Sequence, residues 1–564
     1  MPDPVNAGAK PARITVKKGR TPFAEITAAE GANLLDALRD KGFALPADCG
    51  GQGLCGKCLV RVNGELRPAC RLKVYEGLRL ELPETEEATI QTWYPARPEE
   101  NPTEPRRGTQ GSAEPEISPP FSPVGRSDAK SAALAQTARP DAPGGRGTSA
   151  RRFCLAADIG TTTVVAQIAA FREGEAPRIL GTRSFLNGQR SYGADVLSRI
   201  RSADEGNLGA MSAIIRSSLG DALFSLCAEA GLDPEEASSL CVAGNTAMIH
   251  ILLGAPCSSL GRHPYTIRLD LKDSYTFAEV FGKGNGPVVR ILPWISAYVG
   301  GDISAGYLAC RGRRPETALL LDLGTNGEML LWSGERAWCC SAPSGPAFEG
   351  CGISCGVGGV RGAICRVDLL EGNLICRTIE GASPVGVCGS GVLDVLACLR
   401  RGGRIDAEGR LEERLFEKGA RLARAADGRA ITFTQGDVRE AQLAKAAVRA
   451  GLEVLFMESG LRVEDLDSLY LAGGFGQQLR LESAVVAGLL PPEAAAKAIP
   501  VGNSALGGAM RLCGNPELLK EAQSLRERTL EILPAQHPDF QDLFIRHISF
   551  ERSHLPDKKA ADHQ

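Results

Sequence analysis

Two short segments of similar sequence constrain the fold of this chain more than any other feature. Asp322–Glu328 reads DLGTNGE and follows the apolar run Ala318–Leu321, and Asp158–Thr163 reads DIGTTT and follows a second apolar run. Each pattern predicts a buried strand, a tight turn and a second strand. Glycine lets the backbone approach a phosphate closely, and amides and hydroxyls can bind its oxygens. Two such hairpins predict a paired phosphate site.

The candidate nucleotide ligands lie in these hairpins. Asp158 and Asp322, each at the end of an apolar strand, are placed to hold Mg²⁺ through water. The candidate phosphate ligands are Gly160, Thr161, Thr162 and Thr163 in the first hairpin and Gly324, Thr325 and Asn326 in the second.

The paired hairpins resemble the phosphate loops of the actin, hexokinase and heat-shock-chaperone ATPase superfamily. There, two related lobes clamp ATP between the hairpins, so the resemblance implies two lobes that are internal structural repeats. It also implies that the small-residue helix within Tyr298–Gly306 connects the lobes. Asp302 on that helix would then orient the water that attacks the γ-phosphate. An N-cap role for Asp302 is the alternative.

Three further stretches match the superfamily plan. Gly345 stands where the superfamily places a second glycine loop beside the phosphates. Gly473, Gly474 and Phe475 end an apolar strand and resemble the adenosine loop. Gly502–Met510 matches a second inter-lobe helix, whose small residues would let two helices cross closely.

A long helix is predicted between these stretches. Asp437 and Glu440 have the spacing of a capping box before a helix over 441–455, with Leu443 among its inward residues. Lys445 on this helix could reach the nucleotide, although a solvated lysine is the simpler interpretation.

Four cysteines near the N-terminus form a distinct cluster. Cys49, Cys55, Cys58 and Cys70 have the spacing C-x5-C-x2-C-x11-C, and glycines fill the first loop. A [2Fe–2S] cluster needs four thiolates and a loop whose amides point at the sulfurs. The pattern resembles [2Fe–2S] ferredoxins of the β-grasp fold, although plant ferredoxins have C-x4-C and a more distant last cysteine. A zinc knuckle, which would show two C-x2-C pairs, and free thiols are the alternatives.

These features divide the chain into four parts. We expect an α+β β-grasp ferredoxin domain at 12–94 and a flexible linker, poor in large apolar residues, at 95–150. An α/β two-lobed actin-like ATPase with ribonuclease-H-like repeats would span 151–550, followed by a disordered tail at 551–564. The linker has a root-mean-square reach of roughly 40 Å, so the ferredoxin domain would be tethered but mobile.

Bulk composition excludes several classes of function. A chain of 564 residues is too long for one hydrophobic core. Its net charge of −3 gives no overall field for nucleic acid or anionic lipid. No apolar run approaches the ~20 residues of a membrane span, and residues 1–10 lack a signal-peptide core. Most of the 18 cysteines are scattered, as in reduced cytoplasmic proteins. We expect a cytoplasmic protein without nucleic-acid or membrane partners.

The ferredoxin-like head, linker and ATPase-like body together resemble the reductive activators of corrinoid iron–sulfur proteins. The stretches that carry this resemblance are GADVLSRI, VAGNTAMIH, YVGGDISAG, DLGTNGE, GPAFEG, VREAQLAKAAVRAG and LAGGFG. Members of that family often have a small domain between ferredoxin and ATPase, and here the linker is expected in its place. Cys351 and Cys355 after GPAFEG fit a redox pair, thiols shared across a dimer interface, or buried free cysteines.

The resemblance implies an enzyme that repairs an oxidised cofactor. The [2Fe–2S] cluster would accept one electron from a donor such as a ferredoxin, flavodoxin or reductase. That electron would reduce an inactive Co(II) corrinoid protein to Co(I) for methyl-transfer metabolism, with ATP and Mg²⁺ supplying free energy for the uphill step. The corrinoid would arrive on its own protein, and a homodimer is left open.

Two other functions remain open. One is an ATP-driven electron-transfer activator of another low-potential enzyme, such as a hydroxyacyl-CoA dehydratase. Those activators use a [4Fe–4S] cluster between two subunits and lack a ferredoxin head. The other is a small-molecule kinase with an accessory ferredoxin domain, for which no sugar- or carboxylate-binding signature is present.

Overall fold

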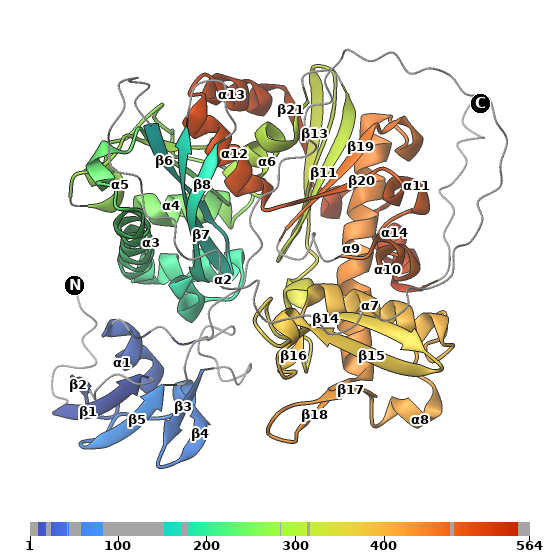
Figure 1. Cartoon of the computed structure of the whole chain (residues 1–564), viewed down its shortest axis with the longest axis horizontal. Coiled ribbons are helices and arrows are strands. Elements are labelled where there is room, and N and C mark those ends of the chain that lie inside the picture. Colours follow the sequence, from blue (N-terminus) through green and yellow to red (C-terminus); the bar gives the residue numbers. More distant parts are fainter. Residues whose placement is uncertain are drawn as a thin grey trace, which may run out of the picture. The chain divides into compact units, whose positions relative to one another are not determined.

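The structure, a computed structural model, contains an N-terminal domain and a large body (Figure 1). The described residues are 10–18, 24–41, 43, 45, 58–82, 152–171, 177–282, 284–312, 316–473 and 479–550. The linker predicted at 95–150 and the tail predicted at 551–564 lie outside them. Within the described ranges, no helix is long and apolar enough to cross a membrane.

The N-terminal domain is a five-stranded sheet with one helix. Its strand order is β2-β1-β5-β3-β4, with β1 parallel to β5 and the other neighbours antiparallel. The elements are β1 (Pro11–Lys18), β2 (Ala24–Ala29), α1 (Leu34–Asp40), β3 (Leu59–Val62), β4 (Glu65–Pro68) and β5 (Leu78–Leu82). In β5 the alternate residues Leu78, Leu80 and Leu82 are buried, as expected for a sheet with one face against a core. The β-grasp prediction agrees with this topology.

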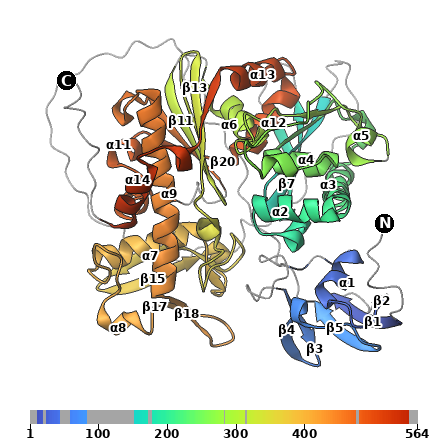
Figure 2. The same cartoon turned by 180° about the vertical axis from the view of Figure 1, so that it is seen from behind.

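The first lobe of the body is a mixed sheet of order β10-β9-β6-β7-β8. Its strands are β6 (Arg152–Ile159), β7 (Thr163–Phe171), β8 (Arg178–Leu186), β9 (Leu240–Gly244) and β10 (Val289–Ile291). Its helices are α2 (Val196–Ser202), α3 (Leu208–Ala230), α4 (Thr246–Leu253) and α5 (Phe277–Phe281). Helices α3 and α4 lie side by side, and α3 packs against β7 and β8 of this sheet (Figure 2).

The second lobe is a sheet of order β20-β19-β11-β12-β13-β21. Its strands are β11 (Thr317–Leu323), β12 (Gly327–Ser333), β13 (Arg336–Ala342), β19 (Ser468–Ala472), β20 (Ala498–Gly502) and β21 (Thr529–Ile532). The long helix α9 (Gln435–Ser459) runs along one face of this sheet (Figure 1). The shorter helices α10 (Leu481–Val486), α11 (Pro492–Ala495) and α14 (Phe540–Ile548) complete the lobe, whereas α13 (Leu518–Arg528) packs mainly against α6 (Gly301–Cys310) in the layer between the lobes.

The two sheets repeat one plan, which confirms the predicted internal repeat. In each lobe an antiparallel three-stranded meander is extended by two parallel strands, as β8-β7-β6-β9-β10 and β13-β12-β11-β19-β20. Helix α6 (Gly301–Cys310) follows the first set, and α12 (Ser504–Gly514) follows the second. These two helices cross between the sheets, and residues of both sheets and both helices share one hydrophobic core.

Small residues make this crossing close, as the sequence predicted. A Cβ added at Gly508 of α12 would collide with the carbonyl oxygen of Ala305 on α6. A Cβ added at Gly306 of α6 would lie 2.9 Å from the hydroxyl oxygen of Ser504 on α12. At Gly508 the two backbones therefore touch, and a larger side chain there would push α12 away from α6, whereas the near neighbour on α12 at Gly306 is the Ser504 side chain.

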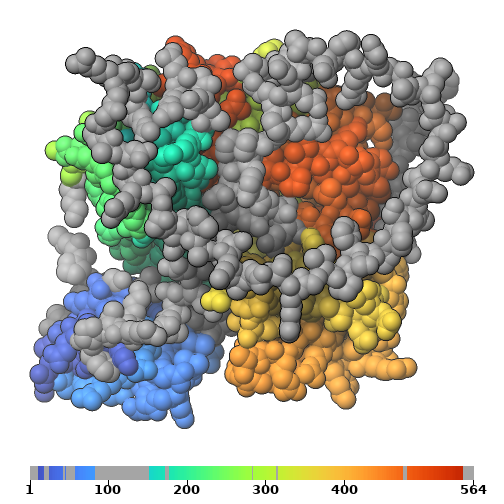
Figure 3. Space-filling model, in the orientation of Figure 1, coloured from blue at the N-terminus to red at the C-terminus, as the bar shows by residue number. Residues whose placement is uncertain are grey.

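An insert between β13 and α9 forms a small additional unit. It contains β14 (Ala363–Leu370), β15 (Asn373–Thr378), β16 (Gly386–Val387), α7 (Gly389–Arg401), α8 (Glu413–Phe416), β17 (Ala420–Arg424) and β18 (Ala430–Phe433). In the space-filling view the insert, coloured yellow to orange, forms one continuous surface (Figure 3).

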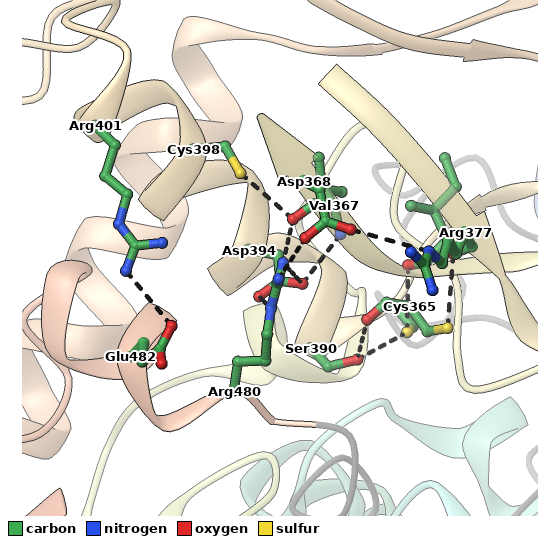
Figure 4. A network of polar contacts seen from close by, with 12 residues as sticks. Cys365, Val367, Asp368, Arg377, Ser390, Asp394, Cys398, Arg401, Arg480 and Glu482 are labelled. Carbon is green, nitrogen blue, oxygen red and sulfur yellow. Dashed lines mark hydrogen bonds and ion pairs between the residues drawn. The ribbon is translucent and has the colours of Figure 1, made fainter. Parts of the chain in front are cut away.

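Arg480 ties the insert to the segment that follows β19. Its Nε donates to Asp394 at 3.0 Å and its Nη2 to the other oxygen of that carboxylate at 2.6 Å (Figure 4). Its Nη1 donates to Asp368 at 2.5 Å. This bidentate pairing fixes the chain directly after residues 474–478, which are not described.

Three predictions about α9 are wrong. The helix begins at Gln435, and its capping box joins Thr434 to Asp437 instead of Asp437 to Glu440, because Thr434 supplies the hydroxyl that caps the helix. Leu443 is 37% exposed, because the helix buries a different face. Lys445 is buried, not solvated, and its Nζ donates to the carbonyl oxygen of Ser549 beyond α14.

Candidate functional site

The alternation of side chains along β6 and β11 places Asp158 and Asp322 on the side of each sheet that faces α6 and α12. In β6, Leu155 and Ala157 face one core, whereas Cys154 and Ala156 face the layer of α6 and α12. Asp158 points to the same side as Cys154 and Ala156, because side chains alternate along a strand. The same alternation in β11 places Asp322 on the inter-lobe side together with Leu320. Both carboxylates therefore reach the ends of the connector helices.

A solvent-open cleft of about 970 Å³ lies at this meeting point. The residues that line it come from both hairpins and both connector helices. They are Asp158, Gly160, Thr161, Thr162, Thr163, Val165, Asn245, Asp302, Asp322, Leu323, Gly324, Thr325, Asn326, Glu328, Glu349, Gly473, Gly502, Asn503 and Ala505. None of these described lining residues is a lysine or an arginine, so the cleft is acidic.

Asn503 links the first hairpin to the second connector helix. Its Nδ2 donates to Asp158 Oδ2 at 2.8 Å, and its Oδ1 caps α12 by accepting from the amide of Leu506 at 2.7 Å. Burial raises the pKa of Asp158 to about 7, assisted by the charge of Asp302 and opposed by the Asn503 hydrogen bond. No local pattern indicated Asn503 as a partner of Asp158, because the two residues are 345 positions apart in the chain.

Asp302 is the second residue of α6, and the N-cap is Gly300. The N-cap alternative for Asp302 is therefore wrong. Its Oδ1 accepts from the amide of Ile303 at 2.9 Å, which holds the carboxylate at the helix N-terminus. Burial raises the pKa of Asp302 to about 6, although backbone amides oppose the rise.

Asp322 and Glu328 add two more carboxylates to the cleft. They face each other across the β11–β12 ladder. Burial, then the charges of Asp302, Asp158 and Glu349, raise the pKa of Asp322 to about 8. Burial and the charges of Asp302 and Asp322 also raise the pKa of Glu328 well above its usual value. A cluster of like charges removed from water in this way is suited to a divalent cation.

The threonine hydroxyls of both hairpins meet at one carboxylate. Glu349, at the end of the 3₁₀ turn Pro346–Glu349, accepts a hydrogen bond from Thr162 Oγ1 at 2.6 Å. The same oxygen, Oε2, accepts from Thr325 Oγ1 at 2.9 Å. Hydroxyls that donate to a carboxylate can equally donate to a phosphate oxygen.

The structure gathers most of the residues predicted from the sequence. Asp158, Gly160, Thr161, Thr162, Thr163, Asp302, Asp322, Gly324, Thr325, Asn326 and Gly473 all line the cleft. Gly345 does not line it, because the turn that follows it directs Glu349 to the cleft instead. Gly474 and Phe475 lie outside the described residues.

Four polar residues that line the cleft were not predicted. Glu328 and Glu349 lie inside the quoted stretches DLGTNGE and GPAFEG, and Asn245 and Asn503 lie inside VAGNTAMIH and at the start of the second connector. A polar residue directly after an apolar strand was the available signal for the asparagines. Nothing in the sequence indicated that Glu349 reaches both hairpins, because its partners lie far away in the chain.

The cysteine cluster is only partly described. Cys58 is fully buried just before β3, and Cys70 follows β4 in a 3₁₀ turn. The amide of Cys70 donates to Cys58 Sγ at 3.5 Å, which is the type of amide–sulfur contact that a cluster thiolate needs. Cys49 and Cys55 lie outside the described residues. The described pair therefore fits cluster ligands.

Burial bears on the reactivity of Cys355, the second of the two cysteines that follow Glu349. Both are half-buried, and burial raises the pKa of the Cys355 thiol to about 12. A redox-active thiol needs a lowered pKa, so Cys355 is unsuited to that role.

The raised pKa values predict that the nucleotide-free protein loses stability as the pH rises. Asp158 and Asp322 titrate near 7 and 8 when folded and at 3.8 in ordinary surroundings, so the folded state holds their protons more tightly. Their contribution is fully present below pH 3.8 and is lost as the pH passes 7 to 8. Thermal unfolding without magnesium should show a lower midpoint at pH 8 than at pH 5.5, and Asp322→Asn should flatten this dependence.

The matched control for the pH experiment is Asp427→Asn, which alters an exposed turn aspartate. It should retain the slope of the unmodified protein. An unchanged slope in Asp322→Asn would show that the cleft carboxylates do not titrate as described.

The fold and cleft define the class of this protein. It is a two-lobed ATPase of the actin-like class with an N-terminal ferredoxin domain. The family model described as "C-terminal domain of RACo the ASKHA domain" matches residues 316–559. The model of the RACo middle region matches 153–313, and the 2Fe-2S iron-sulfur cluster binding domain matches 21–81.

Known proteins identify the family. The corrinoid activation enzyme RamQ of Eubacterium limosum is 30% identical over 424 residues, covering 71% of this chain and 70% of that protein. A Co(II) methylated amine-specific corrinoid protein reductase of Methanosarcina barkeri is 28% identical over 309 residues, covering 50% of this chain and 55% of that protein. The solved structure of a reductive activator for corrinoid, iron-sulfur protein matches with a TM-score of 0.65 and 28% identity. The match covers 95% of this chain and 98% of that protein. The chain belongs to the family of corrinoid-protein reductive activators.

One expectation drawn from the resemblance is wrong. The linker does not stand in place of a middle domain, because the middle-region model covers the first lobe at 153–313. The first lobe is therefore the middle region, and the chain contains it.

Proposed function

We propose that this protein is an ATP-dependent reductive activator that transfers one electron to a Co(II) corrinoid protein and so restores Co(I). The observation that carries the proposal is the acidic, hydroxyl-lined cleft between two repeated lobes, in a chain whose N-terminal domain matches [2Fe–2S] proteins. The named relatives act on corrinoid proteins, which supports this class of substrate.

The cleft has the groups that a magnesium nucleotide requires. Asp158 and Asp322 would hold Mg²⁺ through water, because the described histidine, cysteine, aspartate and glutamate side chains form no group of three or more that could hold a metal ion directly. The hydroxyls of Thr162 and Thr325 would bind phosphate oxygens, with Thr161 and Thr163 in the same turn. Asp302, whose pKa is raised to about 6, would orient and deprotonate the attacking water.

The connector helices α6 and α12 would couple nucleotide binding to the arrangement of the two lobes. Asp302 stands at the start of α6, and Asn503, which holds Asp158, caps α12. A nucleotide that binds these groups better in one lobe arrangement would shift the lobes toward it. ATP can drive the uphill reduction only through such a difference in affinity.

The N-terminal domain would supply the electron. A [2Fe–2S] cluster bound there carries one electron at a time. Cys58 and Cys70, together with Cys49 and Cys55, would be its ligands, and the Cys70 amide is placed to stabilise the sulfur of Cys58. An external ferredoxin, flavodoxin or reductase would reduce this domain.

Location and assembly are the finer parts of the proposal. A cytoplasmic location is supported by the many buried cysteines that form no disulfide among the described residues. We also propose that the domains divide at 12–94, 95–150, 151–550 and 551–564, and that the protein works as a homodimer.

The test is anaerobic reduction of a Co(II) corrinoid protein in the presence of the dithionite-reduced activator. Absorbance should show Co(I) only when ATP and magnesium are present, and iron analysis with EPR should find one [2Fe–2S] cluster per chain. Cys58→Ser should lose the cluster and the Co(I) signal but retain ATP binding. Cys227→Ser, at a buried cysteine of α3 far from both sites in the sequence, is the control and should retain both.

Several results would contradict the proposal. Zinc in place of iron would remove the electron-transfer role. ATP hydrolysis with a normal cluster but no Co(I) would favour another low-potential acceptor, and phosphoryl transfer to a metabolite would favour the kinase alternative.

A further inference from the structure

Glu349 holds the two phosphate hairpins together through one oxygen atom. Oε2 accepts from Thr162 of the first lobe at 2.6 Å and from Thr325 of the second lobe at 2.9 Å. A Cβ added at Gly324 would lie 3.4 Å from the other carboxylate oxygen, Oε1. The carboxylate thus lies against the hydroxyls and the glycine turn that a phosphate group would contact.

The carboxylate and a phosphate cannot share this position. Both are anions, and both need the same two hydroxyl donors. The described residues lining the cleft include no lysine or arginine that could neutralise the Glu349 carboxylate and a phosphate group at the same time. A bound phosphate would therefore have to displace the Glu349 side chain.

The backbone around Glu349 is tightly held. A Cβ added at Gly389, the first residue of α7, would collide with the carbonyl oxygen of Phe348. A Cβ added at Gly350 would collide with the carbonyl oxygen of Val357. Since the main chain is packed on both sides, the carboxylate would leave the hydroxyls by rotation of its own side chain.

We propose that Glu349 is an internal anion that occupies the phosphate position of the empty cleft and is displaced by a phosphate group of ATP. Its bridge between the lobes holds the nucleotide-free arrangement, and it lowers the affinity for nucleotide. This inference rests on the proposed function, since it assigns a competitor to the proposed ATP site.

The test is the affinity of the unmodified protein, Glu349→Gln and Glu349→Ala for the magnesium complex of AMPPNP, measured by titration calorimetry. Removing the charge should tighten binding on the order of tenfold, because a charge-assisted hydrogen-bond competitor is lost. Glu349→Gln keeps the shape and one acceptor oxygen, so its gain should be smaller than that of Glu349→Ala. Glu413→Ala, at an exposed glutamate of α8, is the control and should bind like the unmodified protein.

The outcomes separate this proposal from the proposed function. If the unmodified protein binds AMPPNP and both variants bind equally or more weakly, Glu349 is not a competitor and the ATP site stands. If no form binds AMPPNP, the ATP site itself is rejected and the competition with it. If Glu349→Ala does not fold, Glu349→Gln alone decides, with its thermal midpoint as the check on folding.

Discussion

Asp302→Asn should reduce ATP hydrolysis by roughly 10²- to 10⁴-fold, the range expected for loss of a general base. The asparagine oxygen can still accept from the amide of Ile303, as the Asp302 carboxylate does at 2.9 Å, so α6 should form normally. The amide side chain cannot take a proton from water at neutral pH. The affinity for AMPPNP should therefore stay within a few-fold, and the loss should fall on turnover.

The measurement is ATP hydrolysis at saturating nucleotide, with AMPPNP affinity determined in parallel. Glu482→Gln, an exposed glutamate of α10, is the control and should hydrolyse ATP at the unmodified rate. Unchanged hydrolysis in Asp302→Asn would remove Asp302 from the water-activating role and leave it as a helix-terminal charge.

Gly508→Ala should be among the most damaging small substitutions in the body. A Cβ at this position collides with the carbonyl oxygen of Ala305, so α12 must move away from α6 or distort. Overpacking of this kind costs about 1 to 3 kcal/mol, and occasionally more. We expect a clear fall in the thermal unfolding midpoint and a loss of ATP-dependent Co(I) formation.

Gly209→Ala is the matched control for this prediction. Gly209 also lies in a helix, α3, but a Cβ there would meet no atom within 4 Å. That substitution should be neutral or slightly stabilising, because alanine favours a helix over glycine. Equal thermal unfolding midpoints for Gly508→Ala and Gly209→Ala would mean that α6 and α12 can move apart without loss of stability.

Much of the architecture was predictable because it rests on local patterns. Strand, glycine turn and strand at 155–165 and 318–332 predicted β6–β7 and β11–β12, and their similarity predicted the repeated lobes. The glycines and alanines of 298–306 and 502–510 predicted two helices that cross closely. Small residues can be recognised in a sequence, and they allow close contact wherever the helices meet.

Errors arose where one local signal could be satisfied in two ways. The Asp437–Glu440 spacing had capping form, but Thr434 and Asp437 had it too, and the longer helix buries more apolar surface. Lys445 looked like a surface lysine, yet α14 and the segment after it cover it, and burial lowers its pKa to about 7. Nothing near Lys445 in the sequence indicates that cover.

The sequence by itself determined the two hairpins, their aspartates and hydroxyls, and the cysteine spacing, because each depends on neighbours a few residues apart. The tertiary structure brings Asp158, Asp302 and Asp322, which were expected at one nucleotide site, into one cleft, and it alone decided that Asn503 holds Asp158. It alone placed Glu349 between Thr162 and Thr325. These contacts join residues far apart in the chain, so they exist only once the sheets and connector helices have packed together.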